Sequence, residues 1–241
     1  MSTSNHRCDG AVRPPLDLSL YLVTDTAMCD RAGVPATVAA AVAAGVTLVQ
    51  LRDPAASDGE FVALGRAVGA ALAGTGVPLI VNDRVHLVAA IGAQGAHVGQ
   101  QDLDVGQARA RLGGSAYLGL SAHDIEQVTR AISRGIETLD YLGVGPVWAT
   151  TSKSDAAAPR GVEHLRAMTT SSPWPCVAIG GITPARVAAL RSSGVAGVAV
   201  ISAICGQPDV AAATRALRAA WDDAPHFGVG DGSPLPREES R

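Results

Sequence analysis

Residues 176–202 read CVAIGGITPARVAALRSSGVAGVAVIS and give the clearest indication of the fold. Two short apolar runs within it, Cys176–Ile179 and Gly197–Ile201, have the length and continuous hydrophobicity of buried strands. Between them, Thr183-Pro184 predicts the start of a helix, because threonine caps helix N-termini and proline fits the first turn. A strand, a helix and a second strand in this order predict a βαβ unit with two parallel strands.

The same pattern recurs through most of the chain. Six further apolar runs precede this unit: Leu20–Val23, Thr47–Leu51, Leu79–Val81, Ala96–Val98, Tyr117–Leu120 and Leu139–Val144. Runs that are apolar throughout are typical of parallel strands covered on both faces. Helical patterns separate the runs, and Ser57-x-x-Glu60 predicts a capping box at the start of one helix. In a later helix, Ile125, Val128 and Ile132 predict the buried face.

Eight strand–helix units on about 200 residues favour a single α/β domain, a TIM or (β/α)8 barrel. We place the barrel in residues 18–222 and predict disordered, non-catalytic tails at 1–17 and 223–241, where Pro, Gly and charge occur without an apolar face. The alternative is a doubly wound sheet, which usually has fewer strands and a Gly-rich turn after its first strand. Here Thr24-Asp25 follows that strand, which favours the barrel.

The composition narrows the classes of function. Of 241 residues, 47% are hydrophobic and 3% aromatic, and the net charge is −3. Such a chain can bury a core, but it lacks the aromatic side chains and the basic excess of a nucleic-acid binder. Its four cysteines have no CxxC spacing, which argues against a zinc site or a disulfide scaffold. The sequence contains no signal peptide and no run of about 20 apolar residues, so we expect a cytoplasmic protein without membrane contact.

Function in a barrel of this kind lies at the carboxyl ends of the strands. The second predicted strand ends in Gln50-Leu51-Arg52, and alternation points Gln50 and Arg52 in the same direction. The guanidinium of Arg52 offers a fork of donors that suits phosphate. The alternative is an internal salt bridge between Arg52 and an aspartate.

Two carboxylates follow neighbouring predicted strands. Asn82-Asp83 ends the third strand, and Asp102 follows the fourth. Mg²⁺ binds one or two carboxylates together with water and substrate phosphate oxygens, so Asp83 and Asp102 are candidate metal ligands. Alternatively, Asn82 closes the turn and both carboxylates cap the helices that follow. We expect His97 to be a hydrogen-bonded structural residue.

The fifth and sixth strands lead to further polar groups. Ser121 either donates to a ligand or caps the next helix, and His123 is a candidate general base without a visible paired nucleophile. The longest internal loop, from Gly145 to Gly161, contains four residues that suit an oxyanion or phosphate: Thr150, Thr151, Ser152 and Lys153. A loop of this length often covers an active site, and the alternative is a solvated polar loop.

The last two predicted strands end in a pattern typical of a phosphate site. Gly180 and Gly181 follow the seventh strand, and Ser202 follows the eighth. Paired glycines let backbone N–H groups approach an anion, and the start of the following helix favours negative charge. Many (β/α)8 barrels bind phosphate between these two loops. The residues alone therefore predict a small phosphorylated substrate, but not the reaction.

Nine short motifs occur in order at the predicted strand ends. They are Tyr21-Leu-Val-Thr-Asp25, Gln50-Leu-Arg52, Asn82-Asp83-Arg84, His97-Val-Gly-Gln100 with Asp102, Gly119-Leu-Ser121, Asp140-Tyr-Leu-Gly-Val-Gly-Pro146, Thr150-Thr-Ser-Lys153, Ile179-Gly-Gly-Ile182 and Val200-Ile-Ser202. Together they resemble the thiamine phosphate synthase family over residues 18–221. The resemblance implies a (β/α)8-barrel transferase of thiamine biosynthesis. Such an enzyme joins hydroxymethylpyrimidine diphosphate to thiazole phosphate, releases pyrophosphate and requires Mg²⁺.

The resemblance also implies roles for individual residues. The pyrimidine diphosphate would be bound by Gln50, Arg52, Asn82, Ser121 and Lys153, and the thiazole phosphate by Thr150, Thr151, Ser152, Gly181, Ile201 and Ser202. Asp83 and Asp102 would hold Mg²⁺. The diphosphate would leave first, and the thiazole nitrogen would then capture a pyrimidine cation, so no side-chain nucleophile is required. Arg52, Ser121 and Lys153 are the implied catalytic residues, because charge grows on the departing pyrophosphate.

One position departs from the pattern of the family. Where the family often has Arg-Glu-Lys, this chain has Arg52-Asp53-Pro54, and Pro54 brings neither a charge nor an N–H. Two other functions stay open: a thiazole tautomerase-like paralogue with His123 as acid and base, and a non-catalytic sensor of a phosphate ligand. An Ala-rich helix face is compatible with a homo-oligomer.

Overall fold

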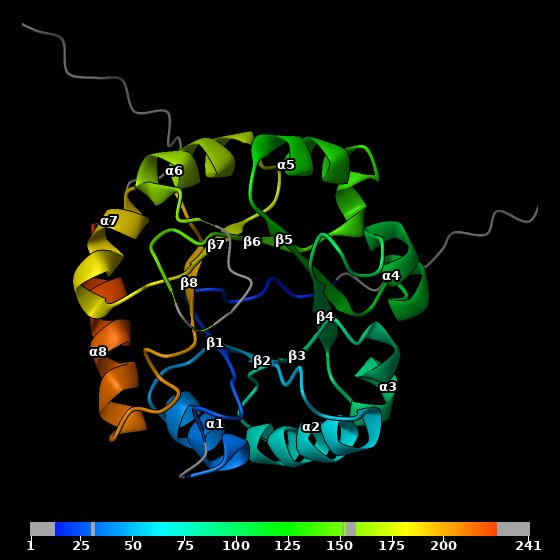
Figure 1. The fold of residues 1–241 in the computed structure, drawn as a ribbon, viewed down its shortest axis with the longest axis vertical. Coiled ribbons are helices and arrows are strands. Elements are labelled where there is room, and N and C mark those ends of the chain that lie inside the picture. The colour runs from blue at the N-terminus through cyan, green and yellow to red at the C-terminus, as the bar shows by residue number, and fades with distance from the viewer. Residues whose placement is uncertain (1–12, 30–31, 151, 153–157, 226–241) are drawn as a thin grey trace, which may run out of the picture.

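Eight parallel strands close into a barrel in the order in which they occur in the chain (Figure 1). The computed structural model describes residues 13–29, 32–150, 152 and 158–225. The strands are β1 (Leu20–Val23), β2 (Leu48–Leu51), β3 (Leu79–Asn82), β4 (Gly95–Val98), β5 (Tyr117–Ala122), β6 (Tyr141–Val144), β7 (Cys176–Ile179) and β8 (Gly197–Val200). The predicted (β/α)8 barrel is confirmed, and the doubly wound alternative is wrong.

Helices form a ring around the barrel (Figure 1). They are α1 (Val34–Ala43), α2 (Asp58–Leu72), α3 (Val88–Ile91), α4 (Val105–Leu112), α5 (Ile125–Ile132), α6 (Gly161–Ser171), α7 (Val187–Arg191) and α8 (Val210–Asp223), with 3₁₀ turns η1 (Val85–Leu87), η2 (Ile136–Thr138) and η3 (Pro184–Arg186). The predicted capping box is confirmed at α2, where Ser57 N–H donates to the Glu60 carboxylate at 2.8 Å and the Ser57 hydroxyl accepts from Glu60 N–H. Within the described residues, every helix is too short or too polar to cross a membrane.

The predicted buried face of α5 is wrong in part. Val128 and Ala131 are buried, but Ile125 and Ile132 are 45% and 37% exposed. At 3.6 residues per turn, Ile125 and Ile132 lie on one edge of the face that Val128 and Ala131 centre on. Val128 and Ala131 therefore face the barrel, and both isoleucines lie toward solvent.

Alternation along the strands divides the core into two layers. Inward residues, such as Tyr21, Leu48, Ile80 and Tyr141, form a cluster inside the barrel. The residues between them pack against the helices in a second, larger cluster. Since side chains in a strand point to opposite faces in turn, each strand supplies both layers and carries its last inward residue to the carboxyl end of the barrel.

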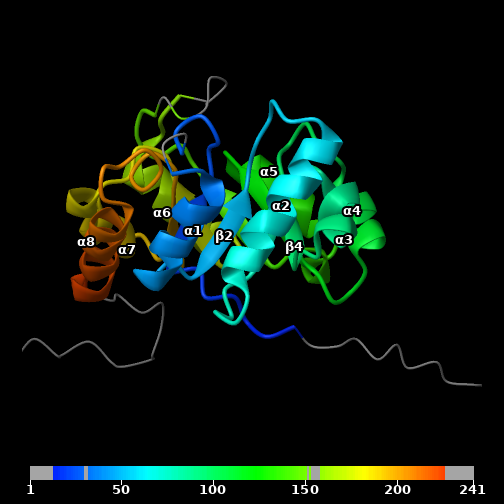
Figure 2. The same cartoon turned by 90° about the horizontal axis from the view of Figure 1, so that it is seen from below.

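The amino end of the barrel is closed by the segment that precedes β1. This segment runs beneath the strands in the side view, opposite the long loops of the other end (Figure 2). Arg13 forms an ion pair with Asp140 at 2.6 Å, and the Tyr117 hydroxyl donates to the Pro14 carbonyl at 2.8 Å. Residues 13–17, which the sequence analysis assigned to a tail, therefore contact the barrel. The other residues of that tail, 1–12, and residues 226–241 lie outside the described part of the chain.

Candidate active site

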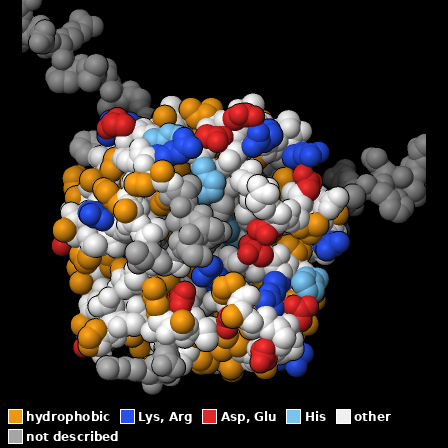
Figure 3. Space-filling model, in the orientation of Figure 1, with side chains coloured by type: hydrophobic (Ala, Val, Ile, Leu, Met, Phe, Trp, Pro, Cys, Tyr) orange, Lys and Arg blue, Asp and Glu red, His pale blue; other side chains and the backbone are white. Residues whose placement is uncertain are grey.

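A cavity of about 430 Å³ opens at the carboxyl ends of the strands. Among the residues that line it are nine of the predicted site residues: Asn82, Asp83, Asp102, Ser121, Thr150, Ser152, Gly181, Ile201 and Ser202. Two predicted residues, Thr151 and Lys153, lie outside the described residues. None of the described residues that line the cavity is Lys or Arg. On this face of the molecule, acidic and basic side chains are interspersed (Figure 3).

The two predicted metal-binding carboxylates line the same cavity from β3 and β4. Asn82 is the last residue of β3, and Asp83 follows it with a φ of 57°. The Asp83 N–H donates to the His97 carbonyl at 2.8 Å, which holds this uncommon conformation at the end of the strand. The side chain of Asn82 donates to Asp83 Oδ2 at 2.5 Å. The carboxylate of Asp83 is therefore fixed beside an amide at the rim of the cavity.

The alternative that these carboxylates cap helices is wrong. The N-cap of α4 is Asp104, whose carboxylate accepts from Gly106 N–H, and the N-cap of η1 is Arg84. Instead, Asp102 Oδ2 accepts from Gly99 N–H at 2.7 Å and closes the turn that follows β4. Since this turn borders the cavity, the bond places the Asp102 carboxylate at its edge.

Gln50 and Arg52 lie in β2 and just after it, outside the set of residues that line the cavity. Gln50 is 4% exposed, and its Nε2 donates to the Tyr21 hydroxyl at 2.7 Å inside the barrel. Arg52 Nη1 lies 3.6 Å from Asp25 Oδ2, so the alternative of an internal salt bridge is confirmed. This ion pair holds the Arg52 guanidinium next to Asp25, just after the end of β1.

Ser121 belongs to β5, which extends two residues beyond its predicted end. Its hydroxyl lies 2.9 Å from His97 Nε2, and His97 Nδ1 lies 3.1 Å from the Tyr141 hydroxyl. His97 is hydrogen-bonded as predicted, and it also lines the cavity, so its assignment as a structural residue stays a prediction. The alternative that Ser121 caps the next helix is wrong, because Asp124 caps α5.

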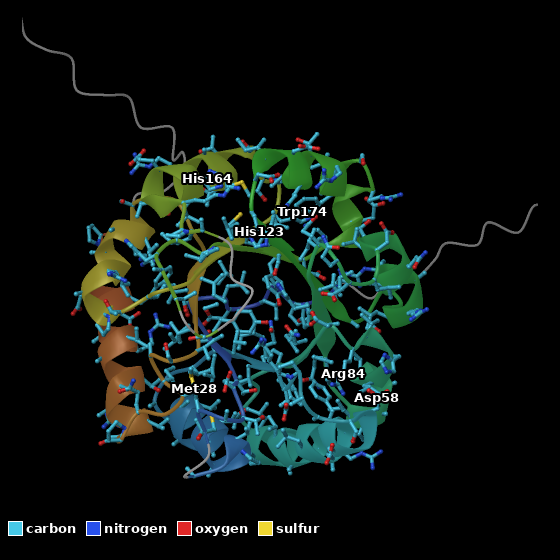
Figure 4. The ribbon with its side chains drawn as sticks, viewed as in Figure 1. Met28, Asp58, Arg84, His123, His164 and Trp174 are labelled. Atoms are coloured by element: carbon cyan, nitrogen blue, oxygen red, sulfur yellow. The ribbon has the colours of Figure 1, made fainter. Side chains whose placement is uncertain are left out.

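His123 lines the cavity next to Gln127. Its Nδ1 lies 2.6 Å from the Gly145 carbonyl, so this nitrogen carries the proton and donates it. His164 of α6 binds the His123 carbonyl at 2.8 Å, and the two histidines lie close together in Figure 4. Among the lining residues that received no ligand role in the sequence analysis are Gln100, Gln127 and Pro146. Gln100 stands in the quoted His97–Gln100 motif, which was the available signal for it.

The predicted phosphate loop after β7 packs closely against the loop after β6. Gly180 and Gly181 have φ angles of 102° and 64°, a region that favours glycine. A Cβ atom at Gly181 would lie 2.7 Å from the Ala149 carbonyl oxygen and 2.8 Å from Trp148 Cβ. Arg186 donates to the Gly181 carbonyl and lies over the Trp148 ring at 4.9 Å. The glycine thus lets two loops that border the cavity meet.

These features define a (β/α)8 barrel with a polar cavity at the carboxyl ends of its strands, where enzymes of this fold carry their active sites. A family model described as thiamine monophosphate synthase matches residues 20–204. The chain belongs to this family.

Individual relatives agree with this assignment. The chain is 44% identical over 204 residues to a thiamine-phosphate synthase of Azorhizobium caulinodans, covering 85% of this chain and 95% of that protein. It is 46% identical over 200 residues to a thiamine-phosphate synthase of a Psychrobacter species, covering 83% and 93%. Among solved structures, a thiamine phosphate pyrophosphorylase from Pyrococcus furiosus matches with a TM-score of 0.77 at 30% identity, covering 86% of this chain and 97% of that one.

Proposed function

We propose that this chain is a thiamine phosphate synthase of thiamine biosynthesis. It joins 4-amino-2-methyl-5-hydroxymethylpyrimidine diphosphate to thiazole phosphate and yields thiamine monophosphate and pyrophosphate. The observation that carries the proposal is the family match over residues 20–204, which spans every strand of the barrel. The cavity supports it, because carboxylates and a glycine loop suited to phosphate border one space. A cytoplasmic location and a homo-oligomer stay predictions.

Asp83 and Asp102 would hold Mg²⁺ together with diphosphate oxygens and water. Mg²⁺ uses one or two carboxylates and keeps several waters, and these two residues line one cavity. No group of three or more His, Cys, Asp or Glu side chains among the described residues could hold a metal, so substrate oxygens would complete the coordination. When bound, Mg²⁺ supplies positive charge that stabilises the leaving pyrophosphate.

Two groups of residues would bind the two phosphorylated substrates. Gln50, Arg52, Asn82, Ser121 and Lys153 would bind the pyrimidine diphosphate. Thr150, Thr151, Ser152, Gly181, Ile201 and Ser202 would bind the thiazole phosphate, near the glycine pair after β7. Arg52 now pairs with Asp25 at 3.6 Å, and a diphosphate with more charge would compete for its guanidinium.

The reaction would proceed by departure of the leaving group before attack. The bond between the methylene carbon and the diphosphate oxygen breaks, both electrons leave with the oxygen, and the aminopyrimidine ring stabilises the remaining cation. The thiazole nitrogen then donates its electron pair and forms the new carbon–nitrogen bond. Arg52, Lys153 and the Ser121 hydroxyl would stabilise the negative charge on the pyrophosphate, and a closed cavity would keep water from the cation.

The test is an assay of pyrophosphate release by the full chain with both substrates and Mg²⁺. We expect release only when all three are present, and thiamine monophosphate as the second product. Ser121→Ala and Lys153→Ala should each lower kcat by about 100-fold, as the loss of one donor to a charged transition state does elsewhere. Ser193→Ala is the matched control, because Ser193 is a buried serine bonded to the Leu190 carbonyl, away from the cavity.

Other outcomes would contradict the proposal. Binding of both substrates without release would indicate the phosphate sensor, and isomerisation of the thiazole phosphate alone would indicate the tautomerase. Wild-type turnover by Lys153→Ala would remove that residue from the mechanism.

A further inference from the structure

We propose that a chain of hydrogen bonds across the barrel interior, Gln50–Tyr21–Tyr141–His97–Ser121, holds the Ser121 hydroxyl with its proton directed into the cavity. Tyr21, Tyr141 and His97 would then be positioning residues that act on the substrate through Ser121. The inference rests on the proposed function, because it specifies how one of the diphosphate-binding residues is oriented.

The chain is continuous and short at every step. Gln50 Nε2 lies 2.7 Å from the Tyr21 hydroxyl, which lies 2.8 Å from the Tyr141 hydroxyl. The Tyr141 hydroxyl lies 3.1 Å from His97 Nδ1, and His97 Nε2 lies 2.9 Å from Ser121 Oγ. Five side chains from five different strands, β2, β1, β6, β4 and β5, are thereby joined in one line that ends at the cavity.

The bonding capacity of the groups favours one direction of the chain. The Gln50 amide nitrogen only donates, so the Tyr21 oxygen accepts from it. Tyr21 then donates its own proton to the Tyr141 oxygen, the next acceptor in the chain. Tyr141 in turn donates to His97 Nδ1. A neutral imidazole that accepts at Nδ1 carries its proton at Nε2 and donates it to Ser121 Oγ. The Ser121 oxygen is then an acceptor within the chain, and its own proton points elsewhere.

Reversing the chain would be costly. If Ser121 donated to His97, the Tyr21 oxygen would accept from both Gln50 and Tyr141, and its own proton would lack an acceptor in the chain. Tyr21 and Tyr141 are 2% and 0% exposed, and a buried donor without a partner is destabilising. Burial raises the pKa of both hydroxyls well above the usual value for tyrosine, so both keep their protons at neutral pH.

The barrel interior is shaped to admit this chain. Gly119 of β5 pairs with His97 on one side and with Tyr141 on the other. A Cβ atom at Gly119 would lie 2.2 Å from Tyr141 Cζ and 2.5 Å from His97 Nδ1, so any side chain there would push the two rings apart. The rings lie 5.4 Å apart between their centroids, and Tyr21 meets Tyr141 edge to face at 5.9 Å. The space that glycine leaves in β5 is what brings the phenol and the imidazole within hydrogen-bond distance.

The experiment is a double-mutant cycle between Tyr141→Phe and Ser121→Ala. It measures the affinity of the full chain for inorganic pyrophosphate with Mg²⁺ by calorimetry, and kcat in the pyrophosphate-release assay. Alone, Tyr141→Phe removes the hydroxyl that donates to His97 Nδ1, so the tautomer in which His97 Nε2 donates to Ser121 loses its support. We expect affinity and kcat to fall about tenfold, as for one lost hydrogen bond to a charged group. In the Ser121→Ala background, the same change should alter either quantity less than twofold.

Tyr117→Phe is the matched control. Tyr117 belongs to the same inner cluster, but its hydroxyl binds the Pro14 carbonyl at the other end of the barrel. It should leave affinity and kcat unchanged in both backgrounds. If Tyr141→Phe does not fold, His97→Phe removes the group that donates to Ser121 Oγ and should show the same dependence on Ser121.

Two results would overturn the inference. Equal losses for Tyr141→Phe with and without the Ser121 hydroxyl would mean that the tyrosine acts through stability of the barrel alone. The absence of any loss in the wild-type background would mean that the direction of the Ser121 proton is unimportant. Failure of the proposed function would be a separate result. If the wild-type protein bound pyrophosphate but formed no thiamine monophosphate, the pyrophosphate affinities of the variants would still test the chain of hydrogen bonds.

Discussion

The two ends of the barrel use the same residue types for opposite purposes. At the amino end, Asp140 accepts from Arg13, from Arg109 and from Leu118 N–H, and every one of these contacts joins parts of the protein to each other. At the carboxyl end, Asp83 and Asp102 border a cavity of about 430 Å³. The difference teaches that an aspartate at a strand boundary indicates function only when its surroundings leave room for a ligand.

The largest effect on turnover is expected when the charge of Asp83 at the carboxyl end is removed. Asp83→Asn preserves the side-chain shape and, since asparagine tolerates a φ of 57°, also the backbone. We expect turnover to fall by about 100-fold or more, because the loss of charge weakens metal binding. Steady-state pyrophosphate release measured against Mg²⁺ concentration checks this, and a normal apparent affinity for Mg²⁺ would contradict the assigned role.

The corresponding change at the amino end should alter stability instead. Asp140→Asn removes the charge between Arg13 and Arg109, at a cost of about 2 kcal/mol for hydrogen bonds to charged partners. For a protein of this size, that loss lowers Tm by about 4–8 °C. Thermal unfolding and turnover at 25 °C, measured together, test whether Asp140 acts on stability and Asp83 on activity. A loss of turnover in Asp140→Asn with an unchanged Tm would contradict this difference between the two ends.

A smaller effect is expected where two loops meet at the cavity. Gly181→Ala places a methyl group 2.7 Å from the Ala149 carbonyl and should raise KM for thiazole phosphate about tenfold by displacing the loop after β6. Gly113→Ala is the matched control, because Gly113 has a φ of 74° but no atom within 4 Å of its Cβ position. It should lower Tm through backbone strain and leave KM unchanged. Equal KM values for both variants would mean that the contact between the two loops does not affect binding of thiazole phosphate.

The smallest effect is expected at Arg13. Arg13→Ala leaves Asp140 bound to Arg109, so the loss should be about 1 kcal/mol for a partly exposed ion pair. Tm should then fall by about 2–4 °C, with kcat and KM unchanged. Thermal unfolding of the full chain checks the contact, and an unchanged Tm would mean that the segment before β1 adds no stability to the barrel.

Much of the fold could be predicted because parallel strands covered on both faces must be apolar throughout. That requirement allowed Cys176–Ile179 and Leu20–Val23 to be predicted as strands. The first and last residues of both strands are confirmed. The buried face of α5 could not be predicted, because isoleucine is apolar wherever it stands. Only packing decides that Ala131, and not Ile132, turns toward the sheet.

The site divides in the same way. Strand ends place Asp83, Ser121 and Gly181 at one cavity, since the carboxyl ends of parallel strands meet on one side of the barrel. The bond from Gln50 to Tyr21, and the choice of Asp25 as the aspartate that pairs with Arg52, could not be predicted, because both partners belong to the neighbouring β1 or follow its end. Contacts of that kind depend on which side chains meet inside the barrel, and the spacing of residues along the sequence does not determine this.

The bond between the Tyr21 and Tyr141 hydroxyls joins residues 120 positions apart in the chain. Its two strands, β1 and β6, are not neighbours in the sheet, so the bond crosses the interior of the closed barrel. The five-residue line is therefore assembled by closure of the barrel, and no half of the barrel contains it. With the role proposed for this line, a fixed Ser121 hydroxyl is a property of the closed barrel as a whole.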